Sequence, residues 1–285
     1  MTIYGDLDQL SRAALAMDRA RIRSALGTRM SVHDTNEAMI AAMAGQMLAD
    51  YLDGIAGGRP RVAMIVPVGP VGQYDLIAEE CRQTGLSLDR LTLVVMDEYL
   101  TDEGQWIAED DPLSFRGHLR RHLLERLPEG SRPELVVPDP ADPGAVGRRI
   151  ADLGGLDVTY AGVGITGHLA FNEPMIGVSD TEYFAGLHTR VVPLLPETRL
   201  INAVTAARGN VARIPRMAVT VGMREILSAR TLRIYMNRHW QSAAIRRLAF
   251  GPREAAFPAS LIQTHPDWHL DVVDHVLDMP EPELA

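Results

Sequence analysis

Two acidic residues stand directly after an apolar segment in the first half of the chain. Residues 94–96 are Val-Val-Met, and Asp97 and Glu98 follow them. Placing a carboxylate at the tip of an apolar strand costs free energy unless the group is solvated or takes part in binding or catalysis. At the carboxyl edge of a sheet, a carboxylate can serve as a general base toward a carbon-bound proton or a water molecule. The alternative for both residues is a solvated loop acid, or an acid that binds the end of a neighbouring helix.

A second, denser group of candidate residues occupies positions 162–174, with the sequence GVGITGHLAFNEP. Glycines in such a segment let the backbone approach a ligand closely, which makes Gly164 a candidate contact. His168 and Glu173 predict an acid/base pair, because an imidazole oriented by a carboxylate can move protons near neutral pH. A buried, hydrogen-bonded histidine is the alternative when His168 is considered alone.

The same segment contains the G-x-G-x-x-G pattern of dinucleotide-binding sites. That pattern requires a long helix that begins within the glycines, and Pro174 ends any such helix within two turns. It also belongs to the first βα unit of a nucleotide-binding sheet, whereas this segment lies in the middle of the chain. We therefore do not interpret the segment as a dinucleotide site.

A glycine-containing turn connects a predicted strand to a predicted helix at residues 67–73. Gly69, Val71 and Gly72 are candidates to hold an anion there, since backbone N–H groups and the start of a helix attract negative charge. Pro70 removes one N–H donor from the turn. A tight turn without a ligand is the alternative.

All 28 basic residues are arginines, and lysine is absent. This excludes a lysine Schiff base on this chain, a pyridoxal-phosphate anchor and the lysine of a P-loop. Arg190 and Arg238 lie at or near strand boundaries, where a guanidinium can bind a phosphate or carboxylate through two hydrogen bonds. A surface ion pair is the alternative for each. His118 and His122 have helical i, i+4 spacing, but Leu119 stands where the zinc motif has Glu, so we predict no metal site.

Composition narrows the classes of partner. The net charge of −9 argues against nonspecific nucleic-acid binding, because neutralising phosphates requires a basic surface. No apolar stretch is long enough to span a membrane, and the first 26 residues lack the apolar core of a secretory signal. Cys81 is the only cysteine, so no intramolecular disulfide can form. These features predict a cytoplasmic protein with no nucleic-acid or membrane partner.

Apolar segments of strand length alternate with helical patterns along the chain. The predicted strands are 62–66, 91–96, 156–161, 217–221, 232–236 and 270–273, and the predicted helices are 35–52, 74–84, 113–127, 145–153, 223–229 and 241–250. Met39, Met43 and Met47, spaced four residues apart, predict a helix face that packs on the core. Nearly continuous apolar strands are typical of a parallel sheet covered on both faces.

These patterns predict an α/β fold, namely a doubly wound, mostly parallel sheet with helices on both faces (Rossmann-like). We expect a single domain over residues 1–285, with an N-terminal helical arm at about residues 1–55. In such sheets ligands bind at the carboxyl ends of the strands. The candidate residues above all follow predicted strands or lie near their boundaries.

Two of these segments resemble the glucosamine-6-phosphate deaminase/isomerase family. They are Met-Asp-Glu-Tyr at 96–99 and the ending G-H-x-A-F-N-E-P at 167–174. The likeness extends from about residue 62 to residue 273 and includes His-Thr-Arg-Val at 188–191. The related 6-phosphogluconolactonases are more weakly similar and usually differ at F-N-E-P. The resemblance also implies an assembly of identical subunits, a homo-oligomer.

The resemblance implies a role for each candidate residue. Asp97 would move a proton between C1 and C2 of an open-chain sugar, as a carboxylate base of ordinary pKa. His168, supported by Glu173, would open the pyranose ring by acting on the ring oxygen and the anomeric hydroxyl. The turn at 69–72 and Arg190 would hold the sugar phosphate. The resemblance implies no metal or organic cofactor.

The chain departs from the family pattern around this site. Thr166 stands where the family has an Asp two residues before the motif's His, and a neutral residue there should weaken His168 as a ring-opening base. Gln241 stands where the family usually has a phosphate-binding Lys, with Arg238 nearby as a substitute. The turn at 68–72 lacks the hydroxyl donors of the family's Thr-Gly-Gly-Thr-Pro. We include Glu98, Thr166, Arg238 and Gln241 among the expected substrate contacts, in an altered anion pocket.

Three functions are compatible with these residues. The first is a sugar-phosphate aldose–ketose isomerase, with or without deamination of an amino sugar. The second is a lactonase-type hydrolase, in which His168 would activate water; the F-N-E-P ending argues against it. The third is a non-catalytic sugar-phosphate-binding module on the same scaffold, which Thr166 and Gln241 favour. All three take a small sugar phosphate or a related anionic sugar as partner.

Overall fold

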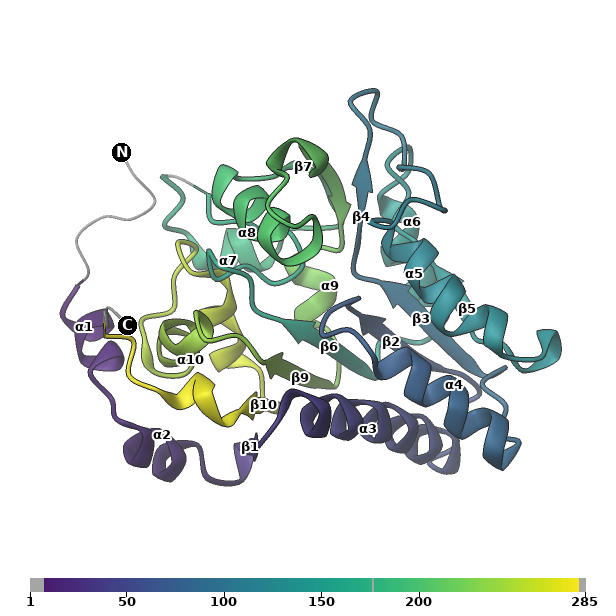
Figure 1. Cartoon of the computed structure of the whole chain (residues 1–285), viewed down its shortest axis with the longest axis horizontal. Helices are drawn as coiled ribbons and strands as arrows, with labels where there is room; N and C mark the ends of the chain where they lie inside the picture. Colours follow the sequence, from purple (N-terminus) through teal and green to yellow (C-terminus); the bar gives the residue numbers. More distant parts are fainter. Residues whose placement is uncertain (1–7, 176, 282–285) are drawn as a thin grey trace.

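Seven strands lie parallel to one another at the centre of the computed structural model, which describes residues 8–175 and 177–281 (Figure 1). Their order across the sheet is β1 (Met30–His33), β10 (Trp268–Val273), β9 (Thr231–Met236), β6 (Val158–Gly162), β2 (Val62–Val66), β3 (Leu91–Val95) and β5 (Glu134–Val136). Every side chain of β2 and β3 is buried. Continuous apolar strands are stable here because both faces of the sheet are covered.

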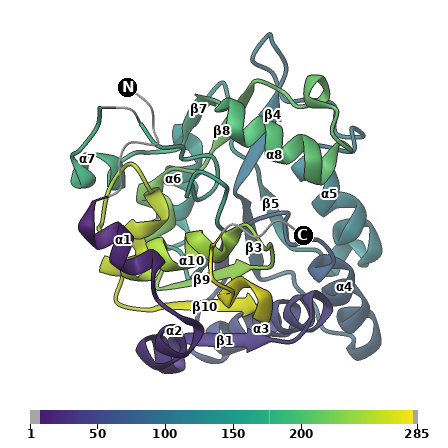
Figure 2. The same cartoon turned by 60° about the vertical axis from the view of Figure 1, so that its left-hand side comes forward.

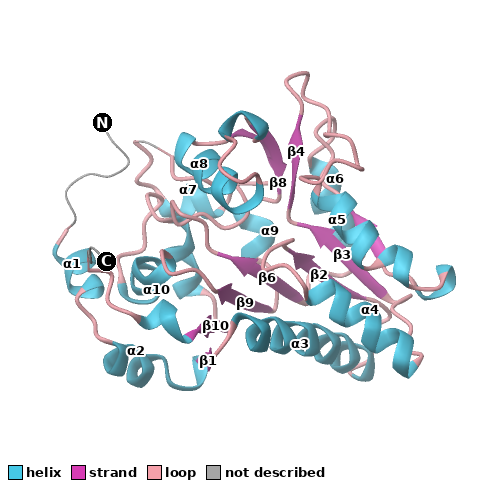
Figure 3. Ribbon diagram, in the orientation of Figure 1, coloured by secondary structure: helices cyan, strands magenta, loops and turns pink. Residues whose placement is uncertain are grey.

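Helices cover both faces of this sheet (Figure 3). One face packs against α3 (Asn36–Ala56), α4 (Gln73–Thr84) and α5 (Phe115–His122). The other packs against α2 (Arg19–Leu26), α6 (Gly144–Asp152), α9 (Met223–Leu227) and α10 (Gln241–Phe250). The prediction of a doubly wound α/β fold is confirmed. Met39, Met43 and Met47 are buried on α3, as their spacing predicts.

Three further α-helices and six 3-10 turns complete the described part of the chain. They are α1 (Gln9–Leu15), α7 (Thr181–Ala185) and α8 (Pro196–Ala206), with the 3-10 turns η1 (Gly27–Arg29), η2 (Leu124–Arg126), η3 (Glu129–Ser131), η4 (Val211–Arg213), η5 (Pro258–Thr264) and η6 (Asp274–Leu277). The helix predicted over 113–127 is shorter, because Ser114 caps α5 and the backbone leaves the helical region at Leu123. No helix follows the glycines of 162–167 in the dinucleotide-site manner.

The N-terminal segment differs from a purely helical arm. Residues 1–7 of the predicted arm lie outside the described residues. Beyond them, α1 and α2 precede β1, which pairs with β10 and forms the edge of the central sheet. Figure 2 shows α1 beside α10 and β1 running along β10. Within residues 8–175 and 177–281, no helix combines the length and hydrophobicity that crossing a bilayer requires.

A second sheet stands over the carboxyl ends of the central strands. It consists of β4 (Asp97–Leu100), β8 (Met217–Thr220) and β7 (Arg190–Pro193), paired antiparallel (Figure 1). The predicted strand 217–221 therefore belongs to this small sheet and not to the parallel one. The apolar pattern of residues 217–221 does not show to which sheet the strand belongs, because a strand of either sheet would be buried. Met96 links the sheets: its N–H donates to Val66 and its carbonyl accepts from Val221.

The direction of winding reverses between β2 and β6. From β2 the chain proceeds outward to β3 and β5, then returns through α6 to β6 on the other side and proceeds to β9 and β10. In an open α/β sheet, loops at such a reversal diverge and leave a crevice at the carboxyl ends. The turns at 67–72 and 163–174 follow these two strands.

Candidate active site

A cavity of about 600 Å³ opens at the reversal between β2 and β6. Its walls come from the turns after β2, β6 and β9, from β4, and from parts of α5 and α8. It contains seven of the predicted site residues: Gly69, Val71, Asp97, Gly164, His168, Arg238 and Gln241. The structure thus brings together residues that lie far apart in the chain, from the turn after β2 to the start of α10.

Asp97 and Glu98 point in opposite directions because they are neighbours on a strand, β4. Asp97 lines the cavity, and its carboxylate makes no hydrogen bond or ion pair with any described residue. Burial raises the pKa of Asp97 well above its usual range, and the nearby Glu98 charge raises it further. The carboxylate is therefore a stronger base than the ordinary one that the resemblance implies.

Glu98 lies outside the cavity, with a completely buried side chain. Its two oxygens accept from the N–H groups of Tyr99, Phe115 and Arg116, which lie 2.9, 3.1 and 3.0 Å away. They also accept from the Ser114 hydroxyl at 2.9 Å and from the Arg116 guanidinium at 3.1 Å. Glu98 is thus not placed to contact a ligand in the cavity. Glu98 instead binds the start of α5, which is the alternative role of an acid that binds the end of a neighbouring helix.

Replacing Glu98 by Gln is expected to destabilise the fold by about 3 kcal/mol, the cost of breaking a buried ion pair. The amide would point N–H groups at backbone donors and would leave the Arg116 guanidinium without its carboxylate. Urea denaturation of the purified variant measures the change. Glu79→Gln is the matched control, since Glu79 pairs with Arg82 on the exposed side of α4 and should matter little. Equal effects of the two variants would contradict this assignment.

His168 lies against the backbone of Gly164. A Cβ atom at position 164 would fall 1.9 Å from Nε2 of the imidazole, so only glycine leaves room for the ring. The other ring nitrogen, Nδ1, lies 2.8 Å from the Thr166 hydroxyl and 3.0 Å from Oε2 of Glu173. Position 164 therefore requires glycine because a side chain there would clash with the His168 ring. This reason is separate from the predicted close approach of the backbone to a ligand.

The hydrogen-bond partners assign the tautomer of His168. The Thr166 hydroxyl donates to Oε2 of Glu173 over 2.7 Å, so its only proton is used. The carboxylate can only accept, and the Thr198 hydroxyl, 3.5 Å from Nδ1, is also hydrogen-bonded to Glu173, so the proton of this cluster is assigned to Nδ1. In the neutral ring, Nε2 then carries a lone pair on the side of Gly164 and the cavity. This is the nitrogen that can accept a proton from a bound sugar hydroxyl.

Glu173 is buried beneath the imidazole and does not line the cavity. Burial alone would raise the pKa of Glu173, but the neighbouring His168 and the hydrogen bonds from His168, Thr198 and Thr166 lower it to about 2. A carboxylate that stays ionised favours the protonated imidazole beside it. Glu173 and Thr166 are thus placed to position His168 and to stabilise its cation, without touching a ligand.

Arg190 is held outside the cavity. One of its guanidinium nitrogens donates to Oδ1 of Asn172 at 2.8 Å and to the carbonyl of His188 at 3.2 Å. Asn172 in turn donates to the carbonyls of Leu169 and Val221. Arg190 therefore fastens the 168–173 loop to the small sheet, and the geometry does not place it to hold a sugar phosphate.

Gln241 lines the cavity, but its amide is engaged by the protein. Its Nε2 donates to the carbonyl of Val163, and its Oε1 accepts from the N–H groups of Asn237 and Arg238, all at 2.8 Å. Gln241 thus holds the turn after β9 against the turn after β6. The Arg238 side chain is exposed at the cavity and pairs with no described residue.

Of the turn after β2, Gly69 and Val71 line the cavity and Gly72 does not. Gly72 is the N-cap of α4 and has φ +125°, a conformation that a side chain would strain. No side chain caps α4, so its first N–H groups keep no side-chain acceptor.

Sequence patterns missed several side chains in this cavity. Tyr99, Asn202, Trp240, His118 and His122 all line it. Alternation along β4 could have indicated Tyr99, two residues after Asp97. Asn202 donates to the Tyr99 hydroxyl at 2.9 Å from α8, a helix that sequence reasoning did not predict.

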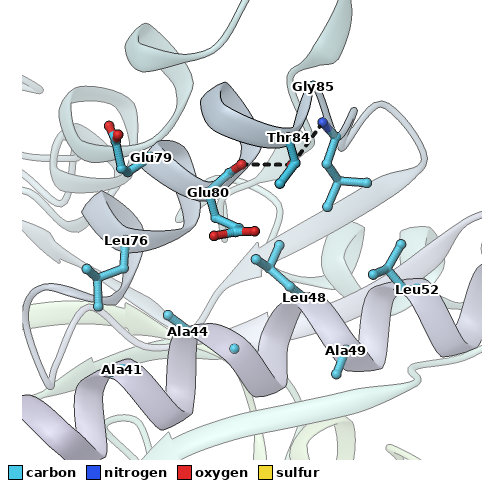
Figure 4. Close-up of a pocket in the computed structure, with 12 residues that line it drawn as sticks. Ala41, Ala44, Leu48, Ala49, Leu52, Leu76, Glu79, Glu80, Thr84 and Gly85 are labelled. Atoms are coloured by element: carbon cyan, nitrogen blue, oxygen red, sulfur yellow. Dashed lines mark hydrogen bonds between the residues drawn. The ribbon is translucent and has the colours of Figure 1, made fainter.

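A larger cavity, of about 770 Å³, lies between α3 and α4 (Figure 4). Its walls are mostly apolar, with Leu48, Leu52 and Leu76 among them, and its only ionisable side chains are Glu79 and Glu80. No imidazole or guanidinium is available there for proton transfer or anion binding. The smaller cavity is therefore the candidate active site. Among the residues that the structure describes, no group of acidic, His or Cys side chains is arranged to hold a metal ion.

Known proteins were compared with this chain by sequence. No family model matches it. It is 32% identical over 206 residues to a glucosamine-6-phosphate deaminase of Rhodopirellula baltica, covering 69% of this chain and 75% of that protein. The deaminase of the same name from Porphyromonas gingivalis is 30% identical over 211 residues, covering 70% and 74%. One from Streptomyces avermitilis is 28% identical over 241 residues, covering 82% and 86%.

Solved structures give a consistent result. A monomeric glucosamine-6-phosphate deaminase superposes with a TM-score of 0.72 at 25% identity, covering 88% of this chain and 99% of that one. A 6-phosphogluconolactonase from Shewanella baltica has a TM-score of 0.61 at 17% identity, covering 86% and 97%. At that identity the second likeness shows the shared fold alone.

Proposed function

Because this chain belongs to the glucosamine-6-phosphate deaminase family, we propose that it is an aldose–ketose isomerase of a sugar phosphate, deaminating where the substrate carries an amino group at C2. The observation that supports the proposal most strongly is the placement of Asp97 and His168 in one cavity at the reversal of the sheet. The Asp97 carboxylate has a pKa raised by burial and no hydrogen-bond partner among the described residues, whereas His168 is bound by Thr166 and Glu173, and this gives the two groups different proton chemistry.

His168 would carry out ring opening. Its Nε2 lone pair accepts the proton of the anomeric hydroxyl, and the resulting imidazolium returns a proton to the ring oxygen as the C1–O bond opens. Glu173 stabilises that imidazolium, and its low pKa keeps it ionised throughout. Thr166 donates to the same carboxylate oxygen, so it helps to fix the imidazole without adding charge.

Asp97 would then transfer the proton between carbons. In the open-chain sugar it removes the C2 proton, and an enediol or enolamine forms as the C2 electrons move toward the carbonyl at C1. The protonated carboxyl returns the proton to C1, while the proton of the C2 hydroxyl or amino group passes to the oxygen on C1, so that the double bond to the heteroatom forms at C2. The raised pKa suits both steps, because the same group must accept and then donate. In an amino sugar this transfer gives an imine at C2, and attack of water on C2 then yields the 2-keto sugar and ammonia.

We propose that the anion pocket is altered relative to the family pattern. Arg190 is bound to Asn172, and Gln241 is bound to three backbone groups. Arg238 is the permanently charged cation on the cavity wall within the described residues. The family pattern provides an arginine at position 190 and a lysine at position 241. In this chain the substrate meets only Arg238 among the arginines of the described cavity wall.

Nuclear magnetic resonance in deuterated water tests the reaction. With a panel of amino-sugar and hexose phosphates, the proposal predicts loss of the C2 proton signal in at least one sugar, with ammonia release from amino sugars. Thermal stabilisation by a sugar without exchange or turnover across the panel would favour the non-catalytic binding module. Hydrolysis of 6-phosphogluconolactone without exchange would favour the lactonase.

The contacts of the Thr166 hydroxyl with Glu173 and His168 reverse the expectation that a neutral residue weakens His168, and Thr166→Asp is expected to lower turnover about tenfold or more. The new carboxylate would lie beside Glu173, and two like charges in a buried site raise one another's pKa and compete for His168. Thr166→Val, which removes only the hydroxyl, should also reduce turnover. A rise in activity with Asp would contradict this result and identify Thr166 as a missing acid.

A cytoplasmic location and an assembly of identical subunits stay predictions of the sequence. Gel filtration with light scattering measures the assembly. The proposed chemistry needs neither, because the cavity described above is built from a single chain.

A further inference from the structure

One indole stands on the wall of the active-site cavity without a partner in the described part of the chain. Trp240 lines the cavity directly before α10, and no described residue forms a hydrogen bond or a ring contact with it. Its Nε1 is not buried. The proposed proton transfers do not use this side chain.

The chain's other tryptophans are engaged by the protein and lie off the cavity wall. Trp106 donates to the carbonyl of Pro138 at 2.8 Å, and the Arg116 guanidinium lies over its ring, 5.0 Å from the centroid. The ring of Trp268 is covered in the same way by a guanidinium at 5.2 Å. Trp240 thus differs from both in having its ring face and its N–H unoccupied.

Every other aromatic ring on the described cavity wall packs on a neighbouring ring. Tyr99, for example, packs on Phe115 and Phe171, with centroids 4.9 and 5.6 Å apart. Those rings therefore contribute to the packing of the protein itself. The indole of Trp240 has no such contact, which leaves an aromatic face available to a ligand.

The turn that carries Trp240 is fixed by its other side chains. The amide of Asn237 donates to the Asn36 side chain at the start of α3. The ring of His239 stacks on that of His275, with centroids 3.9 Å apart. The indole is thus presented from a backbone that the fold holds in place, which reduces the entropy lost when a ligand binds.

The same turn is fastened to the loop that holds the catalytic imidazole. Gln241, next to Trp240, donates to the carbonyl of Val163 at 2.8 Å. The residue after Val163 is Gly164, against which the ring of His168 lies. Because β6 and β9 are neighbours in the sheet, Trp240 and His168 stand on adjacent turns of one cavity.

A closed sugar ring is chemically suited to an indole. The axial C–H groups of a pyranose with equatorial substituents form an apolar face, and the face of an aromatic ring is negative enough to attract such C–H groups. The indole N–H can in addition donate to a sugar hydroxyl. An open-chain sugar has no rigid face, and ordering its rotatable bonds costs entropy.

We propose that Trp240 is the platform on which the closed pyranose ring of the substrate stacks before His168 opens it. This deepens the proposed function and rests on it for the order of events. Trp240 is a binding residue that selects the cyclic form over the open chain. The competing explanation is a partly exposed apolar side chain without a role, of the kind that protein surfaces often carry.

Three variants separate these explanations. Trp240→Leu keeps an apolar side chain and removes the aromatic face, whereas Trp240→Phe keeps a smaller aromatic face. Trp106→Leu is the matched control, because Trp106 is also partly exposed but lies outside the cavity wall. The probes are the 1,5-anhydro form of glucosamine 6-phosphate, a ring that cannot open, and its alditol form, an open chain. Both carry the same phosphate, so phosphate recognition cancels in the ratio of their affinities.

Trp240→Leu is expected to weaken binding of the anhydro sugar about fivefold to tenfold, as measured by calorimetry, and binding of the alditol by less than about twofold. Trp240→Phe should recover part of the loss, and Trp106→Leu should stay within about twofold for both probes. The KM of the ring-closed substrate should rise with little change in kcat, since the platform holds the ground state. The anhydro sugar should change the tryptophan fluorescence of the parent and of Trp106→Leu, but not that of Trp240→Leu.

An unchanged affinity ratio in folded Trp240→Leu, or a parent protein that does not bind the anhydro sugar, would overturn the inference. Turnover with an unchanged ratio would leave the isomerase standing without the platform. Conversely, ring binding that depends on Trp240 in a protein without C2 proton exchange would support the inference while the proposed function fails. If Trp240→Leu does not fold, Trp240→Phe and the fluorescence of Trp106→Leu decide the outcome.

Discussion

Replacing Asp97 by Asn is expected to lower the rate of C2 proton exchange by between about a hundredfold and ten-thousandfold, the range that a positioned general base contributes. The amide has nearly the same shape and cannot accept the proton. Exchange in the parent protein should also fall as the pH decreases through the raised pKa of Asp97, because only the ionised carboxylate accepts a proton. Proton loss from the sugar in deuterated water, followed over a range of pH, measures both effects.

The same variant is expected to be more stable than the parent near neutral pH. The folded-state pKa of Asp97 is raised above the unfolded value of 3.8, so the folded state favours the protonated carboxyl. Stability from that preference is complete below the unfolded pKa and is lost as the pH rises through the folded one. The neutral amide of the variant avoids this loss, and the stability gap should widen with pH. A destabilised Asp97→Asn protein, or one with undiminished exchange, would contradict the assigned role.

Replacing His168 by Gln is expected to reduce turnover of a ring-closed sugar by between about a hundredfold and ten-thousandfold. Gln cannot accept the anomeric proton at the position of Nε2 and cannot form the cation that Glu173 stabilises. Steady-state kinetics on the substrate identified in the panel measures the loss. Substrate binding should suffer less than turnover, because the imidazole is one contact among many on the cavity wall.

Gly164→Ala provides an independent test of the same imidazole. The added methyl would lie 1.9 Å from Nε2, so the ring must move, and turnover should fall although all proposed catalytic groups are present. Gly45→Ala is the control, since nothing lies within 4 Å of a Cβ at that position on α3 and alanine favours the helix. Full activity in Gly164→Ala would show that the ring position is not critical.

Local sequence information was sufficient for the parts of the fold that depend on neighbouring residues. The buried strands β2 and β3 are continuous apolar runs, and the methionine face of α3 follows the helical period. The sequence predicts that residues 97–100 follow the end of a strand, yet they pair with β8 as a strand of the small sheet. That pairing joins Asp97 to Thr220, a distant position in the chain that no local pattern encodes.

The candidate site shows the same division. Local patterns were enough to predict that Asp97, His168 and Glu173 come after strands of a parallel sheet, whose carboxyl ends share one edge. Which of these groups face a ligand depends on how the strands and helices pack. Adjacent side chains on β4 point to opposite faces, so Asp97 enters the cavity while Glu98 binds the start of α5.

Packing also decides which of the predicted anion-binding side chains are available to a ligand. Arg190 lies outside the cavity with one guanidinium nitrogen bound to Asn172, and three backbone groups use the amide of Gln241. His118 and His122 reach the cavity because α5 packs across the start of α4. The sequence gives the chemical type of each side chain. Whether its hydrogen-bond donors and acceptors remain available to a ligand depends on the neighbours that folding brings to it.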